Sequence, residues 1–154
     1  MLRVAQIIGA GEWAQAVADT ITLDYDGRCR RRRVMTADGG TQFLIDLPRP
    51  VTLADGDALS LDDGCLICVR AAPESLTEIH GASPRELARY AWHVGNRHLP
   101  AQLLDGCLRL REDHVIVNML RQLGAEVRPV KAPFEPEGGA YARHDHAPHV
   151  HAHD

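Results

Sequence analysis

The chain has 154 residues, of which 45% are hydrophobic and 25% charged, and its formal net charge is −4. This length suits one domain of ordinary size or two small ones. The acidic balance argues against a general nucleic-acid binder, which usually carries a basic excess. No stretch approaches the roughly 18 apolar residues of a membrane-spanning helix, and the N-terminus lacks the pattern of a secretory signal. We therefore expect a protein that binds neither nucleic acid nor membrane. Its scattered cysteines fit the reducing cytoplasm.

Residues 1–70 are predicted to form an all-β domain. Turn dipeptides recur between short apolar or alternating runs, a pattern typical of β-hairpins. These dipeptides are Asp26-Gly27, Asp38-Gly39, Asp55-Gly56 and Asp63-Gly64. Pro48 and Pro50 indicate a loop or a sheet edge in the middle of the domain. Residues 71–74, which contain Pro73, are the predicted linker.

Residues 75–141 are predicted to form a second domain, so that the fold class is α+β. Ser83-Pro84-Arg85-Glu86 is a capping box with proline at the first helical position. Asp113 is a suitable N-cap for a second helix, and Gly124 a suitable end for it. Short strands are predicted before, between and after these helices. The resulting order β-α-β-β-α-β is that of a ferredoxin-like domain.

Residues 142–154 form a histidine-rich tail that is predicted to be disordered without a ligand. Its five histidines fall within ten residues: His144, His146, His149, His151 and His153. Neutral imidazole is a common ligand of borderline divalent metals, so the tail predicts metal binding. A purification tag or a compositional bias is the alternative, but a tag is usually an uninterrupted histidine run. The tail alone does not indicate which metal binds.

His98 and His114 are the candidate ligands outside the tail. Projected along the first helix at about 100° per residue, the His98 side chain falls on the apolar stripe with Leu87 and Val94. A histidine in such a place is usually a core or interface residue. One imidazole makes a poor site, but a two-fold dimer axis beside His98 would supply a second. His114, next to Asp113, is either an accessory ligand or a surface residue of the first helical turn.

Three other motifs have simpler interpretations. Cys65-Leu-Ile-Cys68 lies in a predicted strand, where its cysteines would point to opposite faces and act as structural residues. Gly9 to Ala14 fits the dinucleotide-binding fingerprint, but the βαβ repeats that this fold needs do not follow. The arginines in 28–33 could contact RNA or an acidic partner, although a solvated strand edge is the simpler interpretation. No nucleophile–base–orienter set stands out, so we do not expect an enzyme.

The segment Gly95-Asn-Arg-His98-Leu-Pro100 resembles the UreE family of urease accessory proteins. Arg109 to Leu120 is similar to the second-helix segment of that family, and 132–141 to the stretch before its histidine tail. In the first domain, Asp38-Gly39 and the stretch 47–57 follow the family as well. The resemblance therefore covers nearly the whole chain.

This resemblance implies a β domain like the peptide-binding domains of Hsp40-type chaperones, followed by a ferredoxin-like metal-binding domain. It also implies a cytoplasmic homodimer whose central Ni²⁺ site uses His98 of each chain. Zn²⁺, Cu²⁺ or Co²⁺ could bind the same sites. The implied partners are an accessory GTPase and the urease apoprotein complex. His114 matches a peripheral ligand of some members, whereas Glu112 stands where some members carry another histidine. A general divalent-metal storage protein is the alternative function.

Overall fold

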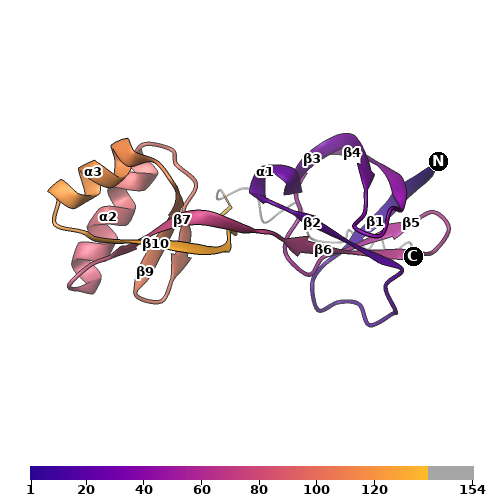
Figure 1. Ribbon diagram of the computed structural model, residues 1–154, viewed down its shortest axis with the longest axis horizontal. Helices are drawn as coiled ribbons and strands as arrows, with labels where there is room; N and C mark the ends of the chain where they lie inside the picture. Colours follow the sequence, from indigo (N-terminus) through magenta and orange to yellow (C-terminus); the bar gives the residue numbers. More distant parts are fainter. Residues whose placement is uncertain (139–154) are drawn as a thin grey trace, which may run out of the picture.

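The computed structural model describes residues 1–138, which form two lobes along the long axis of the molecule (Figure 1). The predicted tail, including all five of its histidines, lies outside the described residues. The first lobe contains β1 (Leu2–Ile8), β2 (Asp19–Leu23), α1 (Tyr25–Arg28), β3 (Cys29–Thr36), β4 (Gln42–Thr52), β5 (Ala58–Leu61) and β6 (Leu66–Ala71). The second contains β7 (Pro73–His80), α2 (Pro84–Asn96), β8 (Gln102–Leu104), β9 (Cys107–Arg111), α3 (His114–Gln122) and β10 (Glu126–Pro133).

The first lobe is a curled six-stranded sheet in the order β2-β6-β5-β1-β4-β3. Its buried side chains form one cluster that includes Phe43, Ile45, Leu59 and Ile67. Because strands alternate their side chains between two faces, curling the sheet lets one face of every strand share this core. The prediction of a β domain is thus confirmed over this part of the chain.

Three local features differ from the sequence predictions. The turn expected at Asp26-Gly27 is the helical turn α1, which begins after Asp24; the Asp24 carboxylate accepts from the Gly27 amide at 2.6 Å. Pro48 and Pro50 do not interrupt β4, but they lie in the stretch of β4 where its pairing with β3 shifts register, between Asp46 and Val51. The linker predicted at 71–74 is reduced to Ala72, because β7 already begins at Pro73.

The second lobe is a ferredoxin-like domain, as predicted. Its sheet has the order β10-β7-β9-β8, and every neighbouring pair is antiparallel. The Ser83 hydroxyl accepts from the Glu86 amide at the start of α2, and Asp113 accepts from Val115 and Ile116 at the start of α3. Both helices therefore begin where the sequence indicates.

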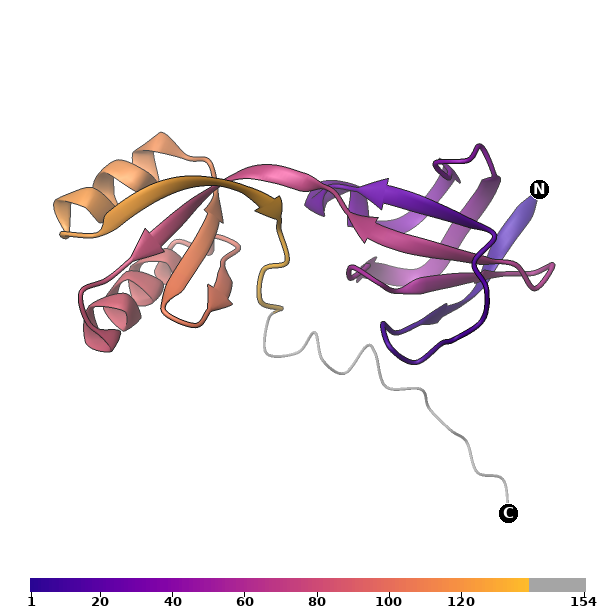
Figure 2. The ribbon, with the colours of Figure 1, turned by 60° about the horizontal axis from the view of Figure 1, so that its bottom comes forward.

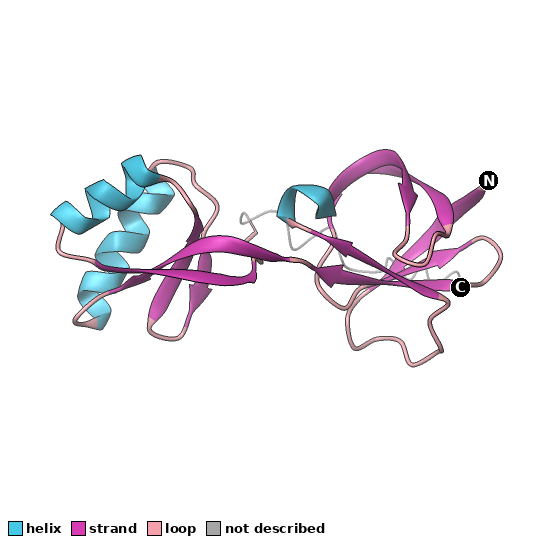
Figure 3. Cartoon of the chain, in the orientation of Figure 1, coloured by secondary structure: helices cyan, strands magenta, loops and turns pink. Residues whose placement is uncertain are grey.

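Helices α2 and α3 lie on one face of this sheet, at the end of the molecule away from the first lobe (Figures 2 and 3). The core between helices and sheet is formed by Ile79, Tyr90, Val94, Leu108, Leu110 and Leu120. Residues that alternate with the core positions of β7 and β9 point to the opposite face. No helix among residues 1–138 is long and apolar enough to cross a membrane.

Arg28 connects the two lobes. Its side chain is 1% exposed; Nη1 donates to the carbonyl of Leu53 at 3.1 Å, and Nη2 donates to the carbonyl of Phe134. Phe134 also packs edge-on against Tyr25, with ring centroids 5.4 Å apart. Buried polar groups are costly unless paired, so these bonds fix how the segment after β10 lies against the first lobe.

Candidate metal site

His98 lies in the turn after α2 rather than on the helix. The helix ends at Asn96, Arg97 is its C-cap, and His98 is exposed. The prediction that His98 shares the apolar stripe of Leu87 and Val94 is therefore wrong. That projection assumed two more helical residues than the chain forms. The exposed position leaves the imidazole available to a ligand or a second protein chain.

The turn that holds His98 is a Schellman motif. The His98 amide donates to the carbonyl of Gly95 at 3.0 Å, and the Leu99 amide donates to the carbonyl of Val94 at 3.4 Å. Leu99 also packs against the core cluster that contains Val94, which is the apolar contact that usually accompanies this motif.

His98 takes the left-handed position that glycine usually fills in such a motif. Its φ is 56°, and it is the only non-glycine residue with positive φ among residues 1–138. This conformation costs roughly 1–2 kcal/mol for a residue with a β-carbon. Backbone strain of this kind is concentrated at functional positions. The histidine is thus held in a fixed, exposed place at a cost that glycine would avoid.

The segments next to His98 and His114 line a common pocket. Its volume is about 340 Å³, and its lining includes Leu99 and Pro100 from the turn after α2 and Glu112 and Asp113 from the start of α3. His114 is the first residue of α3 and is exposed. In the sequence the two histidines belong to different elements. In the fold, the segments next to them line one pocket that also contains the carboxylates of Glu112 and Asp113.

The described part of the chain does not complete a site around His98. Among residues 1–138 only one group of three histidine, cysteine or carboxylate side chains is close enough to hold a metal ion, and it contains neither His98 nor His114. Further ligands for His98 would have to come from another chain or from the tail. The tail histidines cannot be placed, because they lie outside the described residues.

The group that does converge is Glu78, His80 and Cys107, which the sequence interpretation missed. Their potential ligand atoms all lie within 4.8 Å of one another. Glu78 and His80 alternate along β7 and therefore share a face, which the sequence does reveal. Cys107 joins them only through the β7–β9 register, where it pairs with His80, and that register is not readable from sequence.

The electrostatics of this group are set by its close packing. Partial burial raises the pKa of Glu78, but hydrogen bonds from His80 and Arg109 outweigh it, so this pKa lies below its usual value. Burial and the neighbouring Glu78 carboxylate raise the pKa of the Cys107 thiol. In the metal-free chain Glu78 is thus ionised near neutral pH and Cys107 is a thiol.

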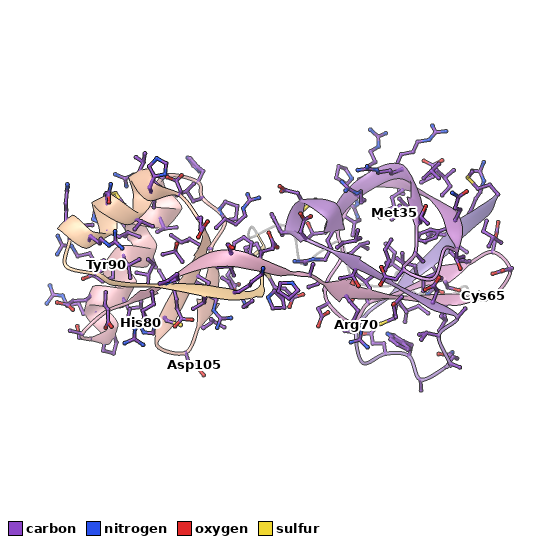
Figure 4. The ribbon with its side chains drawn as sticks, in the orientation of Figure 1. Met35, Cys65, Arg70, His80, Tyr90 and Asp105 are labelled. Carbon is purple, nitrogen blue, oxygen red and sulfur yellow. The ribbon has the colours of Figure 1, made fainter. Side chains whose placement is uncertain are left out.

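Within residues 1–138, Cys65 and Cys68 belong to no group of three potential metal ligands. Cys65 is exposed just before β6, whereas Cys68 is buried within that strand, and all four cysteines are free. Figure 4 shows Cys65 at the far end of the first lobe. The prediction that the motif lies in a strand holds for Cys68, which is buried, and is wrong for Cys65, which is exposed and precedes the strand.

The fold and its exposed histidine define a protein with a β lobe followed by a ferredoxin-like lobe that presents His98. Family models for the UreE urease accessory protein match almost all of the chain, the N-terminal domain over residues 4–72 and the C-terminal domain over 74–154. The chain belongs to the UreE urease accessory protein family. This is an accessory chaperone family rather than an enzyme family.

Similar proteins agree with this assignment. A protein of Rhodopseudomonas palustris (strain BisB18) named "Urease accessory protein UreE" is 53% identical over 152 residues, covering 96% of this chain and 72% of its own. A protein of the same name from Bradyrhizobium sp. (strain BTAi1) is 49% identical over 154 residues, covering 100% of this chain and 75% of its own.

Proposed function

We propose that this protein is a metallochaperone that binds Ni²⁺ and delivers it during assembly of the urease active site. The observation that carries the proposal is the geometry of His98, an exposed imidazole held at the strained end of α2. Membership of a urease accessory family supplies the process in which a bound metal would be used. Domain limits of 1–70, 75–141 and 142–154 and a cytoplasmic location are part of this proposal.

The central site forms between two copies of the chain. Because His98 belongs to no group of three potential metal ligands among residues 1–138, a two-fold axis beside it is the simplest source of a second imidazole. Glu112 and Asp113 line the pocket nearby together with Arg111, so two carboxylates face one guanidinium and leave a net negative charge that favours a cation. His114, at the edge of the same region, serves as an accessory ligand.

The tail histidines His144, His146, His149, His151 and His153 collect metal and pass it to His98. A chain segment that becomes ordered when it chelates a metal loses conformational entropy, so the tail should bind metal loosely and release it readily. Imidazole sites also exchange metal faster than thiolate cages. Copper binds nitrogen sites more tightly than nickel does, and Zn²⁺ and Co²⁺ can bind as well, so selectivity comes from metal supply and from the partners. These are the accessory GTPase and the urease apoprotein complex.

Urease activation in cells that lack their own copy of the gene tests the proposal. The full chain should restore activity, His98→Ala should restore little, and a chain ending at Tyr141 should restore part of it. His93→Ala is a matched control, since His93 is on α2 but off the proposed site. Full activation by His98→Ala at limiting nickel would refute the central role of His98.

Metal storage is the competing function, and the histidine-rich tail is the feature that favours it. If the tail were the whole function, removing residues 142–154 would abolish urease activation and His98→Ala would have little effect. The same two variants therefore separate delivery from storage.

A further inference from the structure

One face of the four-stranded sheet in the second lobe is covered by no helix of residues 1–138 (Figure 3). This face carries a compact group of side chains that could bind a metal. Glu78 and His80 extend from β7, and Cys107 from β9. They alternate with Ile79 and Leu108, which point into the core beneath α2 and α3. Figure 4 labels His80 in this lobe. The group thus lies across the sheet from the helices and apart from the turn that holds His98.

We propose that Glu78, His80 and Cys107 form a second metal site, specific for a borderline divalent cation such as Zn²⁺. This site is independent of the proposed nickel delivery by His98. A thiolate, an imidazole and a carboxylate are the side chains that bind such ions, and three protein ligands leave a fourth position for water or an incoming ligand.

The positions of the three side chains fit this chemistry. His80 Nε2 and Glu78 Oε1 are hydrogen-bonded at 2.6 Å, so the two ligand atoms already face one place where a metal can bind both. His80 and Cys107 are directly paired across β7 and β9. A tetrahedral ion holds its ligand atoms roughly 3.5 Å apart. Since the three ligand atoms lie within 4.8 Å of one another, small side-chain rotations suffice.

The surroundings hold the ligands in place without closing the site. Arg109 Nε donates to Glu78 Oε2 at 3.1 Å and so orients the carboxylate, as second-layer hydrogen bonds do in metal sites. The side chains of Glu78 and His80 are 14% and 24% exposed, so an ion can reach them. The Arg109 charge also repels a cation, and we expect weaker binding than in a closed cysteine–histidine cage.

Titration with Co²⁺ under reducing conditions tests the proposal, because a cobalt–thiolate bond gives a near-ultraviolet charge-transfer band that imidazole and carboxylate ligands do not give. The full-length chain should show this band. Cys107→Ser should abolish the band. His80→Ala and Glu78→Gln should weaken Co²⁺ binding by at least ~10-fold, because loss of a residue that only hydrogen-bonds to a ligand already costs about that much in metal affinity. Competition with Zn²⁺ should remove the band.

Two controls make the result specific. Cys65→Ser removes an exposed cysteine of the other lobe and should leave the band unchanged. His98→Ala should also leave it unchanged, whatever it does to nickel delivery. Far-ultraviolet circular dichroism of each variant establishes that it is folded. The absence of the band from the unmodified chain, its persistence in folded Cys107→Ser, or its loss in His98→Ala would overturn the proposal.

Discussion

The His98 amide donates to the carbonyl of Gly95 at 3.0 Å, and this bond places a histidine where helix-terminating turns normally have glycine. With φ at 56°, the backbone bends away from α2 directly at the candidate ligand. The direction of the imidazole is thereby tied to the end of the helix and not to a mobile loop. A metal ligand that must meet its counterpart across a dimer axis benefits from such fixation.

Replacing His98 by glycine should stabilise the protein while removing the ligand. Glycine relieves the left-handed strain, partly offset by its greater freedom in the unfolded chain, so we expect a gain of about 0.5–1 kcal/mol in the free energy of unfolding. His98→Ala keeps the β-carbon and should stay close to the unmodified stability. Urea denaturation of both variants measures the difference. A loss of stability in His98→Gly would mean that the imidazole makes stabilising contacts.

Removing the tail should lower the amount of nickel bound without removing the tightest site. A chain that ends at Tyr141 lacks five histidines but keeps His98 and His114. Equilibrium dialysis against nickel at several concentrations should show that only the weaker sites are lost. Binding by the tail should be weaker because ordering a chain segment around the metal lowers its conformational entropy. Loss of the tightest site in the shortened chain would place that site in the tail.

Arg28 should be one of the most sensitive positions for stability. Arg28→Met would leave the buried carbonyls of Leu53 and Phe134 without their donor, at a cost of about 1–3 kcal/mol for each unsatisfied group. Arg3→Met is the control, since the Arg3–Asp46 pair is exposed and 4.0 Å apart. Such surface pairs contribute about 0–1 kcal/mol. Urea denaturation should separate the two variants, and equal effects would contradict the connecting role of Arg28.

Acid should weaken the first lobe through Asp38. Hydrogen bonds from the Thr22 hydroxyl and amide, joined by one from the Thr20 hydroxyl, lower the pKa of Asp38 below its ordinary value and together outweigh the opposing effects of burial and of the nearby Asp19 charge. A carboxylate with a lowered folded pKa stabilises the fold above its unfolded pKa, and this stabilisation is lost as the pH falls through the folded pKa. Asp38→Asn should therefore be less stable than the unmodified chain at neutral pH, with a difference that shrinks in acid.

Urea denaturation at neutral pH and at about pH 3, below the unfolded pKa of aspartate, checks this prediction. Asp105→Asn is the matched control, because Asp105 lies in the exposed β8–β9 turn. A difference between Asp38→Asn and the unmodified chain that did not change with pH would show that the Asp38 charge is not the cause.

Much of the second lobe could be predicted because its signals are local. Ser83 and Asp113 cap helices through side chains within three residues of their partners, and Gly124 ends α3 with positive φ. The end of α2 could not be predicted in the same way. His98 stands where the usual C-terminal glycine would be, so only Pro100 signals the end of the helix, and the helical projection ran two residues too far.

Features that depend on distant pairing were not accessible from sequence. Arg28 looked like part of a solvated arginine cluster, but it is buried because Phe134, 106 positions later, accepts its hydrogen bond. Cys107 likewise joins Glu78 and His80 only once β7 and β9 are in register. Short-range patterns locate strands and helices, whereas such contacts follow from tertiary packing.

The central claim is that His98 binds Ni²⁺ between two chains, and nickel titration calorimetry combined with molar-mass measurement by light scattering tests it most directly. The unmodified chain should be a dimer with one tightest Ni²⁺ site shared by two chains. His98→Ala should lose that site and keep the weaker tail sites. A His98→Ala dimer that still bound Ni²⁺ at the same tightest site would contradict the account.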